Sequence, residues 1–584
     1  MPAVPRTTAS LLRQCAADRG DNVALVLDGV GHLTYAQWYE QSCSTANGLV
    51  ALGVRPGQRV VVPVEGDWLE YAVAYMAVHL AAAVAVPVPA SLGNESIARV
   101  AVASSAVGVL GAEPVQGVAI WQRSVSDLAK GYDPSAPTVE PTPDDDAEIL
   151  FTSGTTGVPK GVVATHSNLT HTATRSWDGE RRTVLHALPP ASNGGQSLMM
   201  QALSPSPHTV VTMPRFDASR FLVLIEQHRP EVLVLAPAFA IALLRLPDGH
   251  DLSSVRLVRS TSAPITPSTL AALARRFPQA TVVNLYTSTE AWPARASMSY
   301  DPSRPGALGR VEDGERLTVV TADGRPAEPG VAGDVLLRSG GSQRRYLDDA
   351  AATGSVFLDG GWVRTGDVGL LDQDGYLYLR DRRDDSVNSG GRNISTIEAQ
   401  NALAEHPLVQ EAVAFSMPHP VLGQYMVAAA ILTPGTQASS AELVGFVGSK
   451  IGPANAPKRV LVVDDLPRNA LGKVIKSQLR ELVESSVEDQ APSTPMQVAA
   501  ARIWGSLLGV EPETISLQSD WLALGGSSLE AAAASVMVAE ELGLEVAERV
   551  LNSSPTLEEF ATALESAPAV GSTTYDDVPR LARS

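Results

Sequence analysis

Short apolar runs alternate with longer stretches of helical spacing through the first two thirds of the chain. From Asn22 to about Thr365 the apolar runs are rich in Val and Leu: VALVL, RVVVPV, VAVPVP, EILFTS, TVVTM, VLVLAP and TVVNLY. The stretches between them are rich in Ala and Leu. Strands that alternate with helices in this way are typical of βα units, which form largely parallel sheets. The pattern therefore predicts one large α/β body.

The most apolar stretch of this body runs from Tyr71 to Val88. It contains His79, and Pro87 interrupts it before it reaches the ~20 apolar residues that a membrane-spanning helix needs. We therefore expect a buried helix that runs into a strand, and no membrane span.

The rest of the chain divides into smaller parts. Residues Pro326–Leu358 are rich in Gly and turn residues, as expected of a small β-rich subdomain. Residues 486–497 (SVEDQAPSTPMQ) are polar, contain Pro and lack periodicity, which indicates a linker. Residues 498–566 alternate helical periods with one Gly-Gly turn and are near the smallest size that folds alone. Residues 567–584 are expected to form a disordered tail.

Composition and charge exclude several classes of protein. The 584 residues suffice for about four domain-sized units, so a small disulfide-stabilised scaffold is excluded. Cys15 and Cys43 are too few for a metal cluster, and the polar stretch Met1–Gly20 does not look like a secretory leader, so a reduced, cytoplasmic protein is expected. The formal charge of −19 would repel phosphate backbones and anionic lipids. Neither nucleic acid nor a membrane is therefore expected as a partner.

The strongest local signal is FTSGTTGVPKG, from Phe151 to Gly161. It follows the strand-like EIL, and its glycines and hydroxyl residues can form a turn whose amides and hydroxyls face an anion. Since Gly161 follows Lys160 and the spacing differs from that of a P-loop, transfer of a γ-phosphate is disfavoured. The predicted phosphate-binding residues are Thr152, Ser153, Gly154, Thr155, Thr156, Gly157 and Lys160.

This loop resembles the phosphate loop of the adenylate-forming superfamily, which contains acyl-CoA synthetases, luciferases and the adenylation domains of peptide synthetases. The segment NLYTSTEAWP (284–293) resembles a second motif of that family. The resemblance implies that Tyr286 stacks on adenine, that Thr289 binds phosphate and that Glu290 holds Mg²⁺. A carboxylate beside a phosphate site needs a hard cation between the two negative charges, which agrees with this role.

Two further segments resemble the family's ribose and hinge motifs. In RTGDVGLLDQDGYLYLRDRRDD (364–385) the resemblance implies that Asp367 accepts hydrogen bonds from the ribose hydroxyls, that Arg382 lies near the same sugar and that Asp384 is the hinge. SGGRNISTIEAQ (389–400) resembles the loop that follows the hinge.

The last motif, LPRNALGKVIK (466–476), resembles the family's C-terminal motif with its catalytic lysine at Lys473. The resemblance covers about residues 1–485. It implies an N-terminal adenylation subdomain at 1–380, with parallel sheets and a small β subdomain, and a mobile α+β lid at 381–485.

A separate motif, DWLALGGSSLEAAA, extends from Asp520 to Ala533. A Gly-Gly turn places a serine at the start of a helical run, where serine is a common helix cap. The segment resembles the LGG-x-S-L element of acyl and peptidyl carrier domains, whose serine carries 4'-phosphopantetheine. The attachment residue is then Ser528 in a small helical-bundle carrier domain, with Ser527 as the alternative.

An adenylation body fused to a carrier implies two reactions. A small carboxylic acid and ATP give an acyl-adenylate and pyrophosphate, and the pantetheine thiol then forms a thioester and releases AMP. Lys473, Mg²⁺ and the loop amides would stabilise the negative charge that develops in the first reaction.

The chain is thus expected to be an acid–carrier-protein ligase of a nonribosomal peptide or polyketide pathway. Its expected partners are a phosphopantetheinyl transferase and a downstream condensation, ketosynthase, acyltransferase or tailoring enzyme acting in trans.

The residues expected to contact the acid are Asn193, Leu285 and Trp292. Amino-acid-activating relatives carry an aspartate where Asn193 falls, and no Asp or Glu occurs from Arg181 to Pro214. Burial of an unpaired ammonium is costly, so an aryl acid or another amine-free acid is favoured. The alternatives are an amino-acid-activating didomain, a free acyl-CoA ligase and a carrier protein with an inert adenylation body. Asp217 is expected to cap the next helix and not to pair with an ammonium group.

The sequence departs from the family pattern at Thr287 and Asp381, where the family has Gly, and in the loop SVNSGG (386–391). A β-branched residue at 287 would narrow the pocket if its φ were positive. Since the charged groups that the chemistry needs are present, an active enzyme is expected.

Overall fold

The computed structural model forms two compact units. The first is Met1–Asp385 with Arg468–Val474, and the second is Ser386–Pro467 with Ile475–Ser584. The structure describes residues 6–64, 66–111, 115–117, 119–152, 160–173, 182–205, 208–311, 316–338, 340–383, 385–389, 392–419, 423–469, 472–485, 491–517, 519, 521, 524, 526, 528–547, 549–552 and 556–570.

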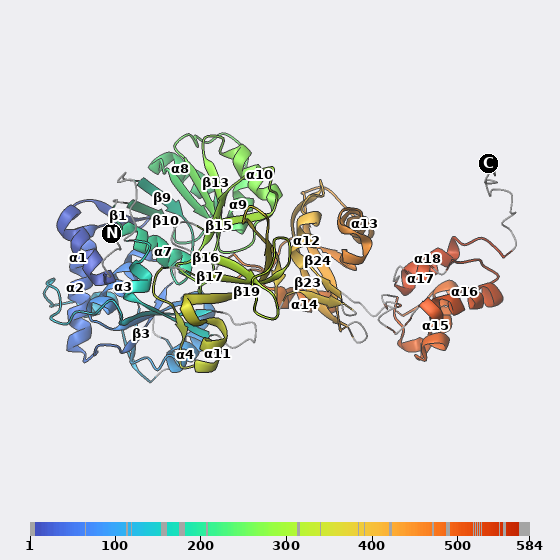
Figure 1. Cartoon of the computed structure of the whole chain (residues 1–584), viewed down its shortest axis with the longest axis horizontal. Coiled ribbons are helices and arrows are strands. Elements are labelled where there is room, and N and C mark those ends of the chain that lie inside the picture. The colour runs from blue at the N-terminus through green and yellow to red at the C-terminus, as the bar shows by residue number, and fades with distance from the viewer. Residues whose placement is uncertain are drawn as a thin grey trace. The chain divides into compact units, whose positions relative to one another are not determined.

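A 13-stranded sheet forms one part of the first unit (Figure 1). Its parallel strands, in spatial order, are β1 (Val23–Leu27), β10 (His208–Thr212), β9 (Arg182–His186), β11 (Val232–Leu235), β12 (Leu257–Ser260) and β13 (Thr281–Tyr286). Strand β2 (Gly31–Thr34) pairs antiparallel with β1 at one edge. Antiparallel strands extend the other side in the order β14 (Ala296–Ser299), β15 (Ala307–Val311), β20 (Leu377–Arg382), β19 (Trp362–Leu371), β17 (Gly333–Arg338) and β16 (Arg316–Val320).

A seven-stranded sheet forms the other part of the first unit. Its order is β18 (Arg345–Tyr346), β8 (Lys160–Thr165), β7 (Asp146–Thr152), β4 (Val84–Pro89), β3 (Arg59–Val64), β5 (Gly108–Leu110) and β6 (Trp121–Arg123). Strands β7, β4, β3, β5 and β6 are parallel, whereas β7–β8 and β8–β18 pair antiparallel. The largely parallel α/β body predicted from the apolar runs is therefore confirmed.

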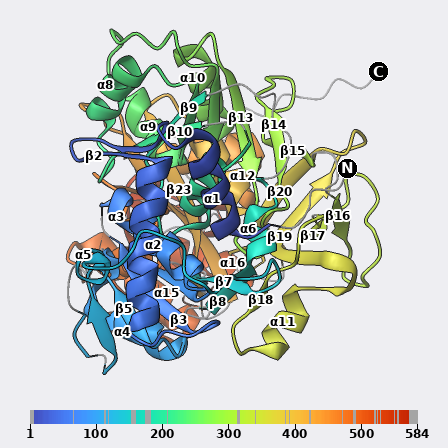
Figure 2. The same ribbon diagram turned by 90° about the vertical axis from the view of Figure 1, so that its left-hand side faces the viewer.

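Helices cover these sheets (Figures 1 and 2). Helices α1, α2 and α3 lie together on one side, and α8, α9 and α10 lie at another. Their bounds are α1 (Thr8–Arg19), α2 (Tyr35–Ala51), α3 (Trp68–Leu80), α4 (Gly93–Ala103), α5 (Val125–Ala129), α6 (His166–Thr170), α7 (Asn193–Ala202), α8 (Ala218–His228), α9 (Pro237–Leu244), α10 (Pro267–Arg276) and α11 (Ala350–Val356).

Two local predictions are confirmed here. The apolar stretch from Tyr71 is the buried helix α3 running into the buried strand β4, and Asp67 begins the helix by accepting hydrogen bonds from the amides of Leu69 and Glu70, both at 2.9 Å. The Asp217 carboxylate caps α8 by accepting a hydrogen bond from the Arg220 amide at 2.7 Å. In the part of the chain that the structure describes, no helix combines the length and apolarity needed to cross a membrane.

The second unit contains a five-stranded sheet with strands β22 (Arg392–Ile394), β21 (Val387–Ser389), β24 (Gly423–Leu432) and β23 (Val409–His419), and with β25 (Arg459–Val462) paired to β24. Helices α12 (Thr396–Leu403) and α13 (Ser440–Ile451) contribute to its apolar core. Helix α14 (Lys476–Ser485) follows.

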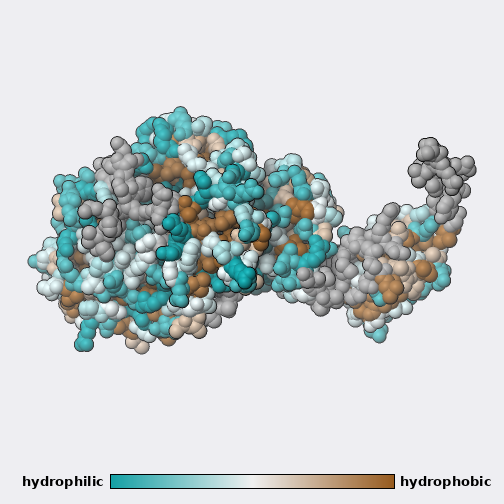
Figure 3. Space-filling model, in the orientation of Figure 1, coloured by the Kyte–Doolittle hydropathy of each residue, from teal (hydrophilic) through white to brown (hydrophobic). Residues whose placement is uncertain are grey.

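The C-terminal helices are α15 (Pro495–Leu508), α16 (Ser528–Leu542), α17 (Arg549–Asn552) and α18 (Leu557–Glu565). Their core centres on Trp504, whose ring lies 5.2 Å from that of Trp521 and 5.6 Å from that of Phe560. Some large apolar side chains of this part stay exposed, among them Leu529 and Val536 of α16, and hydrophobic patches are visible on its surface (Figure 3).

The predicted linker 486–497 overlaps the start of α15 by three residues. Helix α15 begins at Pro495 because Thr494 and Gln497 form a capping box, in which each side chain accepts a hydrogen bond from the other residue's amide.

A row of buried polar groups crosses the core of the first unit. The Tyr75 hydroxyl of α3 donates to Oε2 of Glu148 on β7 at 2.9 Å, and Glu148 is completely buried. Oε1 of Glu148 has no hydrogen-bond partner among the described residues. Burial raises the pKa of the Glu148 carboxyl from 4.5 to about 7, although the Arg344 charge and the Tyr75 hydrogen bond oppose this shift.

We predict that Glu148→Gln changes the pH dependence of stability. The folded-state pKa lies above the unfolded one, so the stability that the protonated carboxyl contributes is fully present below about pH 4.5 and is lost as the pH rises through 7. Between these values the wild type should lose up to about 1.4 kcal/mol per pH unit relative to Glu148→Gln. Calorimetric melting of both proteins from pH 4.5 to 8 tests this, and parallel pH profiles would contradict it.

Candidate functional site

A cavity of about 910 Å³ lies in the first unit. This volume is ample for a nucleotide together with a small acid. Its walls come from the ends of β7, β8, β12 and β13, from α7, and from the segments around 290, 365 and 473. Among the residues predicted from the sequence, the cavity is lined by Thr152, Lys160, Asn193, Leu285, Thr289, Glu290, Trp292, Arg382 and Lys473.

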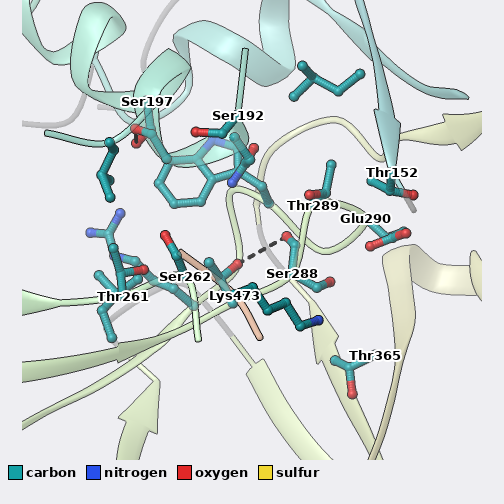
Figure 4. Close-up of a pocket in the computed structure, with 18 of the residues that line it drawn as sticks. Thr152, Ser192, Ser197, Thr261, Ser262, Ser288, Thr289, Glu290, Thr365 and Lys473 are labelled. Atoms are coloured by element: carbon teal, nitrogen blue, oxygen red, sulfur yellow. Dashed lines mark hydrogen bonds between the residues drawn. The ribbon is translucent and has the colours of Figure 1, made fainter. Parts of the chain in front are cut away.

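The cavity has two ends. Figure 4 shows Ser192, Ser197 and Thr261 on one side and Thr152, Glu290 and Thr365 on the other. The first end adjoins α7 and Asn193, where the acid is expected, and the second adjoins the segment expected to bind phosphate.

A chain of contacts joins three predicted nucleotide residues at the second end. The Tyr286 hydroxyl donates to Oδ2 of Asp367 at 2.5 Å, and Nε of Arg382 lies 3.3 Å from Oδ1 of the same carboxylate. Burial raises the pKa of Asp367, while the charges of Arg382 and Lys473 and the Tyr286 hydrogen bond oppose the shift. Asp367 is 5% exposed, and neither Asp367 nor Tyr286 is among the described residues that line the cavity. Of these three residues, Arg382 is the one that lines it.

The loop between β13 and β14 carries Thr289, Glu290 and Trp292. The Tyr346 hydroxyl donates to Oε1 of Glu290 at 3.1 Å, and Nζ of Lys160 lies 5.2 Å from the centre of the Tyr346 ring. A carboxylate, a cation and a phenol therefore meet where phosphate is expected.

Two buried side chains hold this loop from behind. Arg344, 3% exposed, donates from Nη1 to the Thr289 carbonyl and from Nε to Oδ1 of Asn168, both at 2.9 Å. Nδ2 of Asn168 donates to the carbonyls of Trp292 at 3.1 Å and Ser342 at 2.6 Å. Burial lowers the pKa of the Arg344 guanidinium, and the charge of Glu148 opposes this. Arg344 and Asn168 thus fix the loop at both Thr289 and Trp292.

Lys473 lies on a short hairpin in which Arg468 bridges to Val474. The Asn469 amide donates to the Lys473 carbonyl at 2.9 Å, and Oδ1 of Asn469 accepts a hydrogen bond from the Lys473 amide at 3.0 Å. Gly472 has a φ of +72°, a conformation that favours glycine, and a Cβ there would lie 3.4 Å from that of Ala238 on α9. The turn thus presents Lys473 to the cavity.

Helix α7 brings Asn193 to the acid end. It begins at Asn193 because the Ser192 hydroxyl accepts a hydrogen bond from the Gly195 amide at 3.1 Å. A Cβ on Gly195 would lie 2.2 Å from the Pro189 carbonyl oxygen, so only glycine allows this close approach.

The departures from the family pattern fit the local structure. Thr287 is not among the described residues with positive φ, and its hydroxyl donates to the Ala294 carbonyl at 2.7 Å, which joins the two ends of the loop. The condition under which Thr287 would narrow the pocket is therefore not met. Asp381 is 4% exposed, and its carboxylate accepts a hydrogen bond from the Arg382 amide at 2.9 Å.

Several predicted residues lie outside the described residues: Ser153, Gly154, Thr155, Thr156, Gly157, the hinge residue Asp384 and the alternative serine Ser527. The backbone of Ser528 is described, and α16 begins there. Gly526 precedes it, and a Cβ at Gly526 would lie 2.3 Å from the Trp521 ring, so the turn before α16 requires glycine at this position.

The described residues contain no cluster of three His, Cys, Asp or Glu side chains that could hold a metal. Glu290 is a single carboxylate in a cavity large enough for ATP. This donor fits Mg²⁺, which commonly takes one or two protein carboxylates and completes its shell with phosphate oxygens and water.

Sequence reasoning missed Arg344, Asn168 and Tyr346. Arg344 and Asn168 lie in segments remote from the loop in sequence and meet it only after folding. No sequence signal distinguished Arg344 from its half-exposed neighbour Arg345, and none distinguished Asn168.

We predict that Arg344→Met lowers activity with ATP by about 10- to 100-fold, because it removes the donors to the Thr289 carbonyl and to Oδ1 of Asn168 in the core. ATP–pyrophosphate exchange measures the loss, and Arg344→Lys should restore part of it. The matched control is Arg345→Met, which removes a half-exposed arginine paired with Asp146 on the surface. Wild-type exchange by a folded Arg344→Met protein would show that the contact does not position the loop.

The chain matches three protein-family profiles in order. These are AMP-binding enzyme over residues 12–347, AMP-binding enzyme C-terminal domain over 398–473 and phosphopantetheine attachment site over 499–564. The first match alone covers more than half of the chain.

Known proteins similar to this chain include CoA ligases. Sulfoacetate–CoA ligase of Cupriavidus necator is 34% identical over 374 residues, which are 63% of this chain and 73% of that protein. Long-chain-fatty-acid–CoA ligase FadD13 of Mycobacterium tuberculosis is 28% identical over 480 residues, which are 78% of this chain and 94% of that protein.

Two solved structures are similar over most of the chain. ATP-bound MatB from Rhodopseudomonas palustris has a TM-score of 0.74 at 27% identity and covers 82% of this chain and 100% of its own. The amide bond synthetase McbA from Marinactinospora thermotolerans has a TM-score of 0.72 at 27% identity and covers 81% of this chain and 99% of its own. The chain therefore belongs to the AMP-binding enzyme family, as an AMP-forming ligase that activates an acid for thioester formation and carries a C-terminal phosphopantetheine domain.

Proposed function

We propose that the chain activates a small, amine-free carboxylic acid and transfers it to a 4'-phosphopantetheine arm on its own Ser528. The observation that carries the proposal is the succession of AMP-binding and phosphopantetheine parts in one chain. A short tether raises the local concentration of the second reactant to the order of millimolar. Transfer within one chain is therefore favoured over transfer to free CoA.

The first reaction would use the second end of the cavity. Lys160 and the hydroxyl loop after Thr152 would hold the phosphates. Arg382, which lines the cavity, would hold the adenosine, with Asp367 and Tyr286 behind it. Thr289 would bind phosphate, and Lys473 would stabilise the charge that develops when the acid attacks the α-phosphate. Asp384 would serve as the hinge between the two reactions.

Glu290 would hold Mg²⁺, which shields the triphosphate charge when bound. The Tyr346 hydroxyl orients the carboxylate by donating to Oε1, and Arg344 keeps the loop in place. These contacts hold the carboxylate in position before the nucleotide binds.

The charge of the cavity supports an acid without an α-amino group. Glu290 is the only carboxylate among the described residues that line the cavity, and it lies at the phosphate end. Asn193 supplies an amide where an ammonium group would require an anion. The acids named for two of the relatives, sulfoacetate and a long-chain fatty acid, likewise have no amino group.

The thioester would pass to a separate enzyme of a natural-product pathway. The carrier would first need a phosphopantetheinyl transferase, and a condensation, ketosynthase, acyltransferase or tailoring enzyme would then take the acyl group in trans. The exposed Leu529 and Val536 of α16 provide apolar surface for such encounters.

Intact-protein mass spectrometry tests the proposal. We expect a broad phosphopantetheinyl transferase to add one pantetheine mass, which Ser528→Ala abolishes and Ser527→Ala preserves. With ATP, Mg²⁺ and a pool of carboxylic acids, an acyl mass should follow and identify the acid. Lys473→Ala should abolish this second increment.

The matched control is Lys130→Ala, which removes an exposed lysine paired with Asp127. Retention of pantetheine by Ser528→Ala would contradict the attachment site. If the holo-protein stays unloaded while the same pool yields CoA thioesters, the chain is a free acyl-CoA ligase. Loading only by α-amino acids would contradict the amine-free substrate.

A further inference from the structure

Gln201 is a buried polar side chain to which the reaction with ATP assigns no role. It lies near the end of α7, is 8% exposed and lines the cavity. Its carboxamide has no hydrogen-bond partner among the described residues. A buried carboxamide without a partner is costly, because it has given up its hydrogen bonds to water. An acid that fills the cavity displaces water from it, so the acid itself has to supply the partner of this carboxamide.

Two serine hydroxyls close to Gln201 in the sequence already have partners. The Ser192 hydroxyl donates to the Pro189 carbonyl at 2.6 Å, and the Ser197 hydroxyl donates to the Gly194 carbonyl at 2.8 Å. These hydroxyls are satisfied within α7 and the turn before it. Gln201 differs from them because its hydrogen-bonding capacity is unused among the described residues.

An apolar wall adjoins Gln201. Leu188, Leu198 and Val234 belong to one buried apolar cluster, and all three line the cavity. Leu198 lies three residues before Gln201 on α7, a spacing at which side chains are neighbours on the surface of a helix. An acid in contact with this wall therefore has an apolar body, and the carboxamide lies beside that body.

The helix places Gln201 away from the phosphate end of the cavity. In Figure 4 Ser192 lies between Ser197 and Glu290, so α7 runs away from Glu290. Gln201 follows Ser197 by one further turn and lies about 12 Å from Asn193 along the helix axis. Gln201 is therefore placed to meet the part of the acid that is remote from its reacting carboxyl.

We propose that the acid carries a neutral hydroxyl group at the end remote from the reacting carboxyl, and that Gln201 binds this hydroxyl. This inference rests on the proposed function and names its substrate class, an apolar acid with a distal hydroxyl. A hydroxyl both donates and accepts, so it can pair with Oε1 or with Nε2 of the carboxamide. The carboxamide has no net charge and cannot compensate a buried ion, which loses far more hydration than a hydroxyl does.

Non-hydrolysable acyl-adenylate analogues test the inference independently of turnover. The probes are three pairs of acyl-sulfamoyladenosines, benzoyl with para-hydroxybenzoyl, cinnamoyl with para-hydroxycinnamoyl and hexanoyl with ω-hydroxyhexanoyl. The members of each pair differ only in the distal hydroxyl. Calorimetric titration of the full-length chain gives both affinities of a pair.

In at least one pair we expect the hydroxylated analogue to bind about fivefold more tightly, as a buried neutral hydrogen bond provides. Gln201→Met keeps the length of the side chain and removes its polar atoms. This variant should lose the preference for the hydroxyl without weaker binding of ATP or of the analogue that lacks the hydroxyl. Because the carboxamide is unpaired in the free protein, the melting temperature of Gln201→Met should not fall.

The matched control is Gln196→Met, which changes the other glutamine of α7. Nε2 of Gln196 donates to the Tyr71 hydroxyl, and Gln196 is not among the described residues that line the cavity. This variant should lower the melting temperature and keep the preference for the hydroxyl.

Equal binding within all three pairs would overturn the inference. So would a Gln201→Met protein that keeps the preference, or one that binds both analogues and ATP more weakly, because the glutamine would then shape the cavity and not bind the hydroxyl. Loss of the preference in Gln196→Met as well would assign it to the helix. Pyrophosphate exchange with the free acids tests the proposed function separately. A hydroxyl preference without exchange by any acid would support this pocket and contradict the ligase.

Discussion

The loop between β13 and β14 carries Glu290, a carboxylate that lines the cavity, and the buried guanidinium of Arg344 holds this loop in place. Its hydrogen bond to the Thr289 carbonyl, with that of Asn168 to the Trp292 carbonyl, fixes the segment that contains Glu290. Two buried hydrogen bonds thus hold the segment that presents Thr289, Glu290 and Trp292 to the cavity.

The positive charge of Arg344 favours the ionised form of the buried Glu148, whose Oε2 accepts a hydrogen bond from Tyr75. Burial nevertheless raises the pKa of Glu148 to about 7, in a core that also contains the buried ring of His79 beside Tyr75. Lys473 lies in the segment Arg468–Val474, which belongs to the first unit. The residues before and after this segment in the sequence belong to the second unit. This connection is compatible with the proposal that Lys473 acts in only the first of the two reactions.

The sequence predicted what depends on local pattern and on motifs. Apolar runs such as TVVNLY identified the strands, and motif residues as distant as Asn193 and Lys473 line one cavity. The predicted linker extended to residue 497 because the segment lacks apolar periodicity, although Thr494-Pro495 followed by Gln497 is a helix-start signal and α15 begins at Pro495. Arg344 and Asn168 could not be assigned, because their roles depend on contacts between segments far apart in the sequence.

The central claim is that one chain both activates the acid and receives it. Mixing two inactive variants tests this most directly, with holo Lys473→Ala as the carrier and Ser528→Ala as the activating enzyme, at submicromolar concentration with ATP, Mg²⁺ and the acid. Transfer within a chain predicts that the pantetheine arm of Lys473→Ala stays unacylated on the timescale on which the wild type is fully loaded. Loading of the mixture at the wild-type rate would contradict it.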